Sequence, residues 1–189
     1  MGRMESFSDG VIAVILTIMV LELHAPATAT LEGLQEVLLP LFLYALSFII
    51  VASMWVHHHG LLKAAKKTSP RLLWSNNNLL FWMSLIPFAT ATVGKYPREA
   101  WPVAAYGMVF LLTSGSFWIL QTVLARHVGE AGPAKTLGRV RFQALFSVVS
   151  YAVAVVSAFV FLPLSYILFA GIALSYTVPP LVFNKELVD

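Results

Sequence analysis

The sequence has 189 residues, of which 59% are hydrophobic and 11% are charged, and it contains no cysteine. Soluble domains have about 25% charged residues, so this composition predicts an integral membrane protein and excludes a soluble catalytic domain. The net charge of +3 is small, and the lack of cysteine excludes disulfides, thiolate metal sites and cysteine nucleophiles.

Six apolar segments follow one another along the chain. They predict an all-α, polytopic bundle of six transmembrane helices that occupies residues 1–189 as a single transmembrane domain. Pro87 falls inside the third segment, and polar connectors separate most of the others. The expected helices cover about 5–23, 37–58, 72–93, 100–124, 142–162 and 164–182.

Lysine and arginine residues set the expected orientation. The connectors after the second and fourth helices are basic. The connectors on the opposite side of the membrane contain only two basic residues, Lys95 and Arg98. By the positive-inside rule, both termini are expected in the cytoplasm, which agrees with an even number of spans. The basic connector residues are Lys63, Lys66, Lys67 and Arg71 in one connector, and Arg126, Lys135, Arg139 and Arg141 in the other.

The first helix carries two acids that have no place in lipid. Twelve uncharged residues separate Asp9 from Glu22, and they span about 18 Å, less than a hydrocarbon core of about 30 Å. At least one acid must therefore lie at membrane depth, where ionisable groups turn inward and mark a function. We expect this helix in the interior of a bundle, with Asp9 near the cytoplasmic end and Glu22 near the outer end.

Polar residues gather at the predicted cytoplasmic level. Ser8 and Asp9 could simply cap the start of a helix. The alternative is a buried network in which each polar group satisfies another, as a low dielectric requires. Its expected members are Arg3, as counter-charge to the acid, with Ser8, Asp9, Trp55, His58 and Asn76. A single metal ion held by His57, His58 and His59 is disfavoured, because consecutive residues point about 100° apart on a helix.

One face of the first helix is an apolar stripe. Val14, Ile18 and Leu21 fall within about 60° of arc, with Thr17 beside them and Gly10 and Val11 below. This stripe either forms the narrowest part of a central path or packs in the ordinary way, and the pattern itself does not decide between them.

Other function classes have less support. Facing carboxylate pairs are lacking on the later helices, as are the G-x-S-x-G and H-E-x-x-H motifs, so no enzyme is expected. A proton- or ion-coupled secondary transporter is the alternative, with Asp9, Glu22 and a histidine titrating during transport. Such carriers usually contain an inverted repeat with broken helices, and Pro87 has no matching interruption elsewhere.

The chain resembles the transmembrane protein 175 family of potassium channels over essentially its whole length. The pattern that carries the resemblance opens the first helix and is similar to the family's R-x-x-x-F-S-D signature. Further residues similar to those of the family lie at the end of the second helix and along the third. The signature residues are Arg3, Phe7, Ser8 and Asp9, and the further matches are Trp55, His58, Leu73, Trp74, Asn76, Pro87, Phe88 and Thr90.

The resemblance implies a homotetrameric channel in a prokaryotic plasma membrane, permeable to K+ and other monovalent cations. Its partners are copies of itself and the lipid bilayer, with no nucleic acid and no cofactor besides the permeant ion. The first helix of each subunit would line the pore, and Phe7 would belong to the polar network with the rest of the signature. Rings of Val14, Ile18 and Leu21 would form the constriction, flanked by Gly10, Val11 and Thr17, and Glu22 would lie at the outer mouth.

The family often has isoleucine or leucine where this chain has Val14. A smaller side chain leaves a wider gap, so the resemblance implies weak to moderate selectivity for K+ over Na+.

Overall fold

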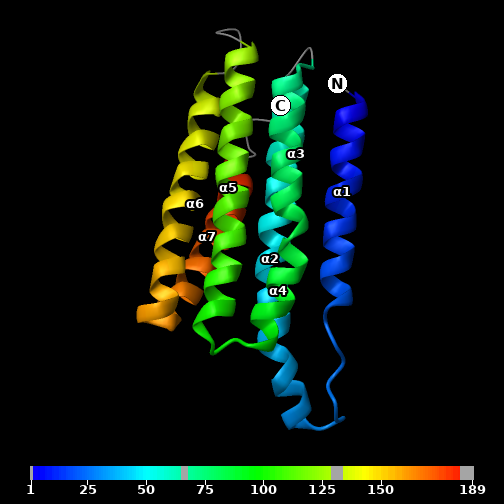
Figure 1. Cartoon of the computed structure of the whole chain (residues 1–189), viewed down its shortest axis with the longest axis vertical. Helices are drawn as coiled ribbons and strands as arrows, with labels where there is room; N and C mark the ends of the chain where they lie inside the picture. Colours follow the sequence, from blue (N-terminus) through cyan, green and yellow to red (C-terminus); the bar gives the residue numbers. More distant parts are fainter. Residues whose placement is uncertain (1, 65–67, 129–133, 184–189) are drawn as a thin grey trace.

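The computed structural model describes the backbone of residues 2–64, 68–128 and 134–183, and the side chains of residues 2–63, 68–126 and 145–176. All secondary structure in these residues is helical, and the helices form one elongated bundle (Figure 1). Three of them, α1, α2 and α5, contain apolar stretches long enough to cross a membrane. The helices are α1 (Gly2–Leu21), α2 (Leu31–Ala64), α3 (Pro70–Ser84), α4 (Ile86–Lys95), α5 (Ala100–Val128), α6 (Ala134–Val160) and α7 (Leu162–Phe183).

The third expected span is broken into two helices. α3 begins at Pro70, where the Ser69 hydroxyl accepts a hydrogen bond from the Leu72 N–H, and it ends before Leu85. Pro87 explains the break, because proline has no N–H and its ring excludes the carbonyl of the preceding turn. The Leu85 N–H bonds to Trp82 and Met83 carbonyls instead. The expectation of one continuous helix over 72–93 was wrong at this point.

Two helices begin earlier than the hydropathy pattern indicated. α2 starts at Leu31, where the Thr30 hydroxyl accepts a hydrogen bond from the Gly33 N–H at 3.3 Å. α6 starts at Ala134, because lysine and arginine are good helix formers in water and extend the helix beyond its apolar part. Of the residues that set the expected orientation, Lys66, Lys67 and the side chains of Lys135, Arg139 and Arg141 lie outside the described residues.

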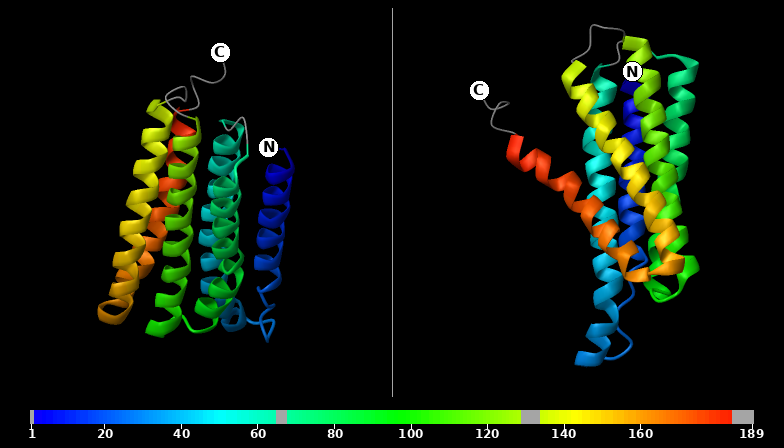
Figure 2. Two further views of the ribbon diagram at one scale, coloured as in Figure 1. Left: turned by 45° about the horizontal axis from the view of Figure 1, so that its top comes forward. Right: turned by 90° about the vertical axis from the view of Figure 1, so that its left-hand side faces the viewer.

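The core is richest where α5, α6 and α7 meet. The rings of Tyr106, Phe110, Tyr151 and Phe169 are fully buried, and the Tyr106 centroid lies 4.8 Å from those of both phenylalanines. The Ser47 hydroxyl lies 2.9 Å from the Thr90 hydroxyl and 3.0 Å from the Tyr106 hydroxyl, which connects α2, α4 and α5. α7 starts beside α6 and leans away from the bundle toward its C-terminal end (Figure 2).

α1 lies at the edge of the bundle, against α2, α3 and α4 (Figure 1). The expectation that α1 occupies the interior is therefore wrong for a single chain. Only 28% of an apolar 18-residue stretch of α1 is buried, compared with 56% of the corresponding stretch of α5. Its polar side chains bond on one flank to α2 and α3, as described below, and this leaves the opposite flank uncovered.

Gly33 fixes the connection between α1 and α2. A Cβ atom at this position would collide with the backbone carbonyl oxygen of Thr28, so Gly33→Ala must displace the connector. We expect a loss of about 1–3 kcal/mol in the free energy of unfolding, typical of overpacking. Thermal unfolding in detergent measures it. Gly60→Ala on the same helix is the control, because a Cβ there meets nothing within 4 Å and alanine favours helix. Equal melting temperatures for both variants would contradict the prediction.

Candidate functional site

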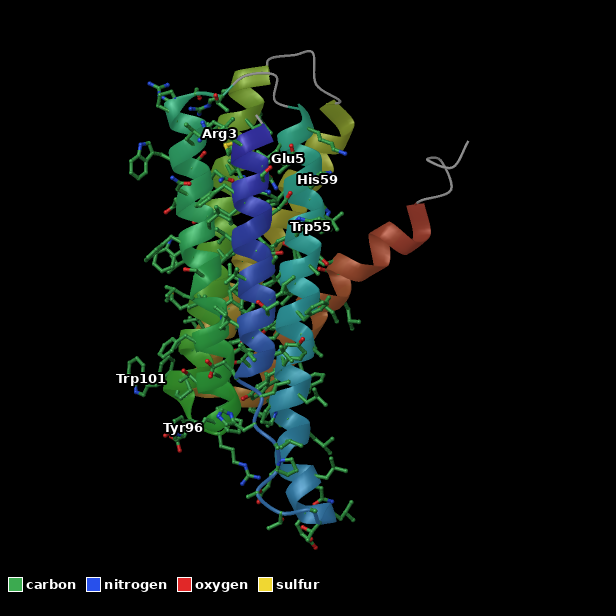
Figure 3. All side chains as sticks on the ribbon, turned by 90° about the vertical axis from the view of Figure 1, so that its right-hand side faces the viewer. Arg3, Glu5, Trp55, His59, Tyr96 and Trp101 are labelled. Atoms are coloured by element: carbon green, nitrogen blue, oxygen red, sulfur yellow. The ribbon has the colours of Figure 1, made fainter. Side chains whose placement is uncertain are left out.

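Two side-chain contacts join α1 to α2 near the start of the chain (Figure 3). The Trp55 Nε1–H donates to Asp9 Oδ1 at 2.8 Å, and His59 Nδ1 lies 3.0 Å from Glu5 Oε1. Glu5 and Asp9 are one turn apart on α1, as are Trp55 and His59 on α2. Because the helices are antiparallel, both pairs come into register. The indole and imidazole rings also stack, with centroids 6.0 Å apart.

A second, fully buried set of contacts joins α1 to α2 through α3. The Asn76 Nδ2–H donates to Ser8 Oγ at 2.9 Å, and the Ser8 hydroxyl donates to the Met4 carbonyl at 2.9 Å. Asn76 Oδ1 lies 2.7 Å from His58 Nε2, and since this oxygen can only accept, His58 carries its proton on Nε2. Ser8 and Asn76 are 0% exposed and His58 is 2% exposed. One asparagine thus connects three helices.

The three consecutive histidines point in three directions, as their spacing predicts. His57 Nδ1 lies 2.7 Å from the Ser53 carbonyl oxygen, and its ring packs edge-on against Tyr176. His58 bonds Asn76, and His59 faces Glu5. Among the described residues, no group of three His, Cys, Asp or Glu side chains is placed to hold a metal ion.

Two residues assigned to the network from sequence lie elsewhere. Arg3 is exposed, and the described residues contain no ion pair between Arg3 and Asp9, whose carboxylate bonds Trp55 instead. The two residues are six positions apart, which places them about 120° apart around the helix. Phe7 is 59% exposed and points away from Asn76, into a groove on the other flank of α1.

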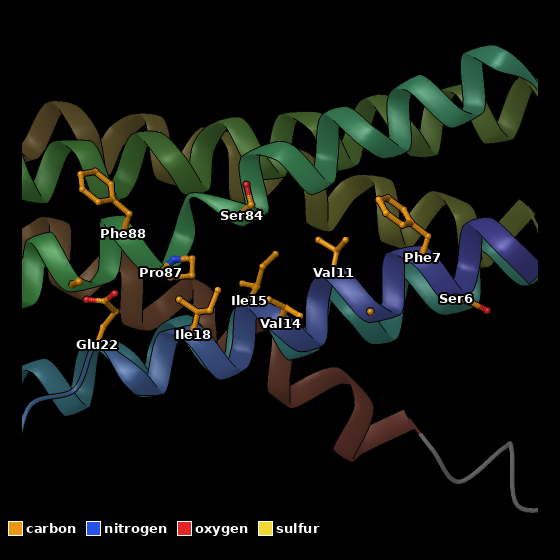
Figure 4. Close-up of a pocket in the computed structure, with 12 residues that line it drawn as sticks. Ser6, Phe7, Val11, Val14, Ile15, Ile18, Glu22, Ser84, Pro87 and Phe88 are labelled. Atoms are coloured by element: carbon orange, nitrogen blue, oxygen red, sulfur yellow. The ribbon is translucent and has the colours of Figure 1, made fainter.

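This groove runs along the uncovered flank of α1 and has a volume of about 750 Å³ (Figure 4). The far wall belongs to the broken span and includes Ser84, Pro87 and Phe88. The α1 wall contains Phe7 and most of the residues predicted to line a pore or its mouth, namely Gly10, Val11, Val14, Ile18 and, at one end, Glu22. Val14 is 54% exposed and Ile18 is 41% exposed.

Two further predicted residues lie on the same uncovered side but outside the groove. Leu21 is 76% exposed, and Thr17 is exposed with its hydroxyl donating to the Val14 carbonyl at 2.9 Å. The sequence prediction missed the wall formed by Pro87 and Phe88. It also missed the Glu5–His59 contact, although the one-turn spacing of Glu5 and Asp9 was a usable signal.

The uncovered side of α1 is apolar between two charged ends. Arg3 and Glu22 are both exposed, and no ion pair involving either is found in the described residues. They are 19 residues apart, about 28 Å along a helix, which is close to the thickness of a hydrocarbon core. The apolar side chains between them provide no catalytic group.

The chain matches the family model described as endosomal/lysosomal potassium channel TMEM175 over residues 3–87. A potassium channel of Chryseobacterium sp. strain P1-3 is 36% identical over 188 residues, which cover 100% of this chain and 98% of that protein. A potassium channel of Streptomyces collinus is 33% identical over 188 residues, which cover 93% of this chain and 90% of that protein. The crystal structure of a lysosomal potassium-selective channel TMEM175 homolog from Chamaesiphon minutus matches with a TM-score of 0.80 at 28% identity, covering 94% of this chain and 96% of that one.

Proposed function

This chain is a potassium channel of the TMEM175 family, and from that premise we propose that four copies assemble around a central pore lined by α1. It is an integral membrane protein and a channel, not an enzyme. In the proposed assembly, K+ and other monovalent cations permeate without a cofactor. The channel lies in a prokaryotic plasma membrane with both termini in the cytoplasm.

The observation that carries the proposal is the uncovered side of α1. Val14, Ile18 and Leu21 are 54%, 41% and 76% exposed in a single chain, and Glu22 borders the same groove. These residues lie on the same uncovered side of the helix, which is the arrangement that a pore-lining helix requires. A closed ring of α1 helices around water would cover this side and place Arg3 and Glu22 at the two mouths of the pore.

Selectivity in the proposed pore comes from rings of apolar side chains. Four copies each of Val14, Ile18 and Leu21 offer an ion no oxygen ligand, so passage requires partial dehydration or a wetted, opened state. K+ holds its hydration shell less tightly than Na+ and is hindered less. Val14 leaves a wider opening than a larger aliphatic residue would, so the selectivity is weak to moderate.

The charged and polar residues of α1 have separate roles in this proposal. Four Glu22 carboxylates at the outer mouth raise the local concentration of cations. The contacts of Asp9 with Trp55, and of Ser8 with Asn76, hold the inner end of α1 against its own subunit. That network is structural and does not bind the permeant ion.

Purified protein in liposomes with a K+ gradient provides the test. We expect unitary currents that reverse near the K+ equilibrium potential. Their reversal potential should shift as Na+ replaces K+. Protein-free liposomes are the control. Slow, saturable uptake linked to a pH gradient, without unitary currents, would contradict a channel and favour a coupled transporter that uses Asp9 and Glu22.

A further inference from the structure

A second cavity lies at the other end of α1 from the polar network. Its volume is about 780 Å³, and its walls are the end of α1, the connector that follows, α2 and α4. The inner surface is apolar and includes Met19, Pro40 and Tyr44. Met19 is 1% exposed, so the cavity reaches into the packed part of the subunit. Of the residues that line this cavity, only Glu22 also has a role in the proposed pore.

Charges of both signs border this cavity. Glu22 and Glu36 contribute carboxylates and Lys95 contributes an ammonium group. Within the described part of the chain, none of the three forms an ion pair, since the contact of His59 with Glu5 is the only pair found there. Lys95 Nζ lies 5.4 Å from the centroid of the Tyr96 ring, a contact that leaves its N–H groups free to donate to a ligand.

The cavity lies where lipid headgroups are expected. Tyr96 and Trp101 are 48% and 77% exposed, and both project from this end of the bundle (Figure 3). Exposed tyrosine and tryptophan are enriched at the membrane–water interface. Leu41, on the cavity wall, is 47% exposed and continues onto the exposed leucines of α2. The charged rim is thus at headgroup level and its apolar floor is continuous with the lipid-facing surface.

We propose that this cavity binds a phospholipid whose headgroup carries both a phosphate and a primary ammonium, as in phosphatidylethanolamine. The ammonium donates to Glu36, the phosphate accepts from Lys95, and one acyl chain lies along Leu41 and Tyr44. An anionic lipid without an amine, such as phosphatidylglycerol, would leave the Glu36 carboxylate unpaired. The trimethylated amine of phosphatidylcholine cannot donate hydrogen bonds to this carboxylate. The charge pattern therefore selects among lipids, which a purely apolar groove would not do.

Native mass spectrometry of the delipidated channel, titrated with the three lipids bearing identical acyl chains, tests the proposal. We expect phosphatidylethanolamine to reach half-saturation at about a fivefold lower concentration than either other lipid, because charge-assisted hydrogen bonds are lost with those. Glu36→Gln and Lys95→Gln should each abolish most of that preference. Glu22 is left unchanged in these variants because it also borders the groove on α1.

The chain supplies matched controls for both substitutions. Glu32 lies one turn before Glu36 on α2, and Arg98 lies three residues after Lys95, yet neither borders the cavity. Glu32→Gln and Arg98→Gln should leave the lipid preference intact. Equal affinity for the three lipids, or equal losses in the control variants, would overturn the proposal. The measurement requires no ion conduction, so its failure would leave the channel function untouched.

Discussion

Replacing Ile18 with Asn should increase the K+ conductance and reduce the K+/Na+ permeability ratio toward one. In the proposed tetramer, this substitution places four amides in the middle ring of an apolar constriction. An amide provides hydrogen bonds to water and ligands to either ion, so both the dehydration barrier and its dependence on ion type fall. We expect a conductance increase of about threefold or more. Reversal potentials under bi-ionic conditions in liposomes or planar bilayers measure the selectivity.

Ile119→Asn provides the matched control for this prediction. Ile119 is 47% exposed, close to the 41% of Ile18, but it lies on α5, away from α1 (Figure 1). The control should retain the permeability ratio of the unmodified channel. If Ile18→Asn leaves the ratio unchanged as well, the constriction lies elsewhere in the molecule.

Replacing Asn76 with Ala should destabilise each subunit more than any other single change in the polar network. The substitution leaves His58 Nε2 without a partner and removes the donor to Ser8 Oγ, which keeps only its own bond to the Met4 carbonyl, at a site where all three residues are almost fully buried. An unsatisfied buried polar group costs about 1–3 kcal/mol and a lost hydrogen bond about 1 kcal/mol, so we expect a total loss of about 2–4 kcal/mol. In detergent, this loss corresponds to a fall of about 5–10 °C in Tm.

Asn77 offers a stringent control because it is the same residue type one position along α3, where it is exposed. Asn77→Ala should change Tm by no more than about 1 °C. Size-exclusion chromatography should show a greater loss of the assembled species for Asn76→Ala, since α1 loses its anchor to α3. Identical behaviour of the two variants would mean that the buried network does not stabilise the subunit.

Much of the helical architecture could be predicted because helices that cross a membrane are apolar over most of their length. Each of the six apolar segments overlaps a helix of the structure, and the third, which contains Pro87, overlaps both α3 and α4. It failed at helix ends in water, where capping by Thr30 and helix propensity in the segment before Phe142 decide the boundary. It also treated Pro87 as tolerated within one helix, whereas the chain breaks at Leu85.

The polar contacts were only partly predictable from sequence. Ser8, His58 and Asn76 form the expected buried contacts, whereas Asp9 and Trp55 form a separate and exposed contact, so the single buried network was only partly predicted. Charge complementarity suggested Arg3 as the partner of Asp9, but the helix geometry points them to different flanks. The groove wall at Phe88 was beyond sequence reasoning, because it depends on how α4 sits beside α1 after the break.

The break at Leu85 has a mechanical consequence. α3 is attached to its neighbours through Asn76 and Asn78, which bond to α1 and α5, whereas α4 is attached through the hydroxyl of Thr90 to α2. A continuous helix would transmit any twist along its whole length. Two short helices separated by a break do not form one continuous element, so each half of the span is held by its own set of polar contacts. The groove wall beside Phe88 is therefore positioned by the contact of α4 with α2, independently of the contacts that hold α3 against α1 and α5.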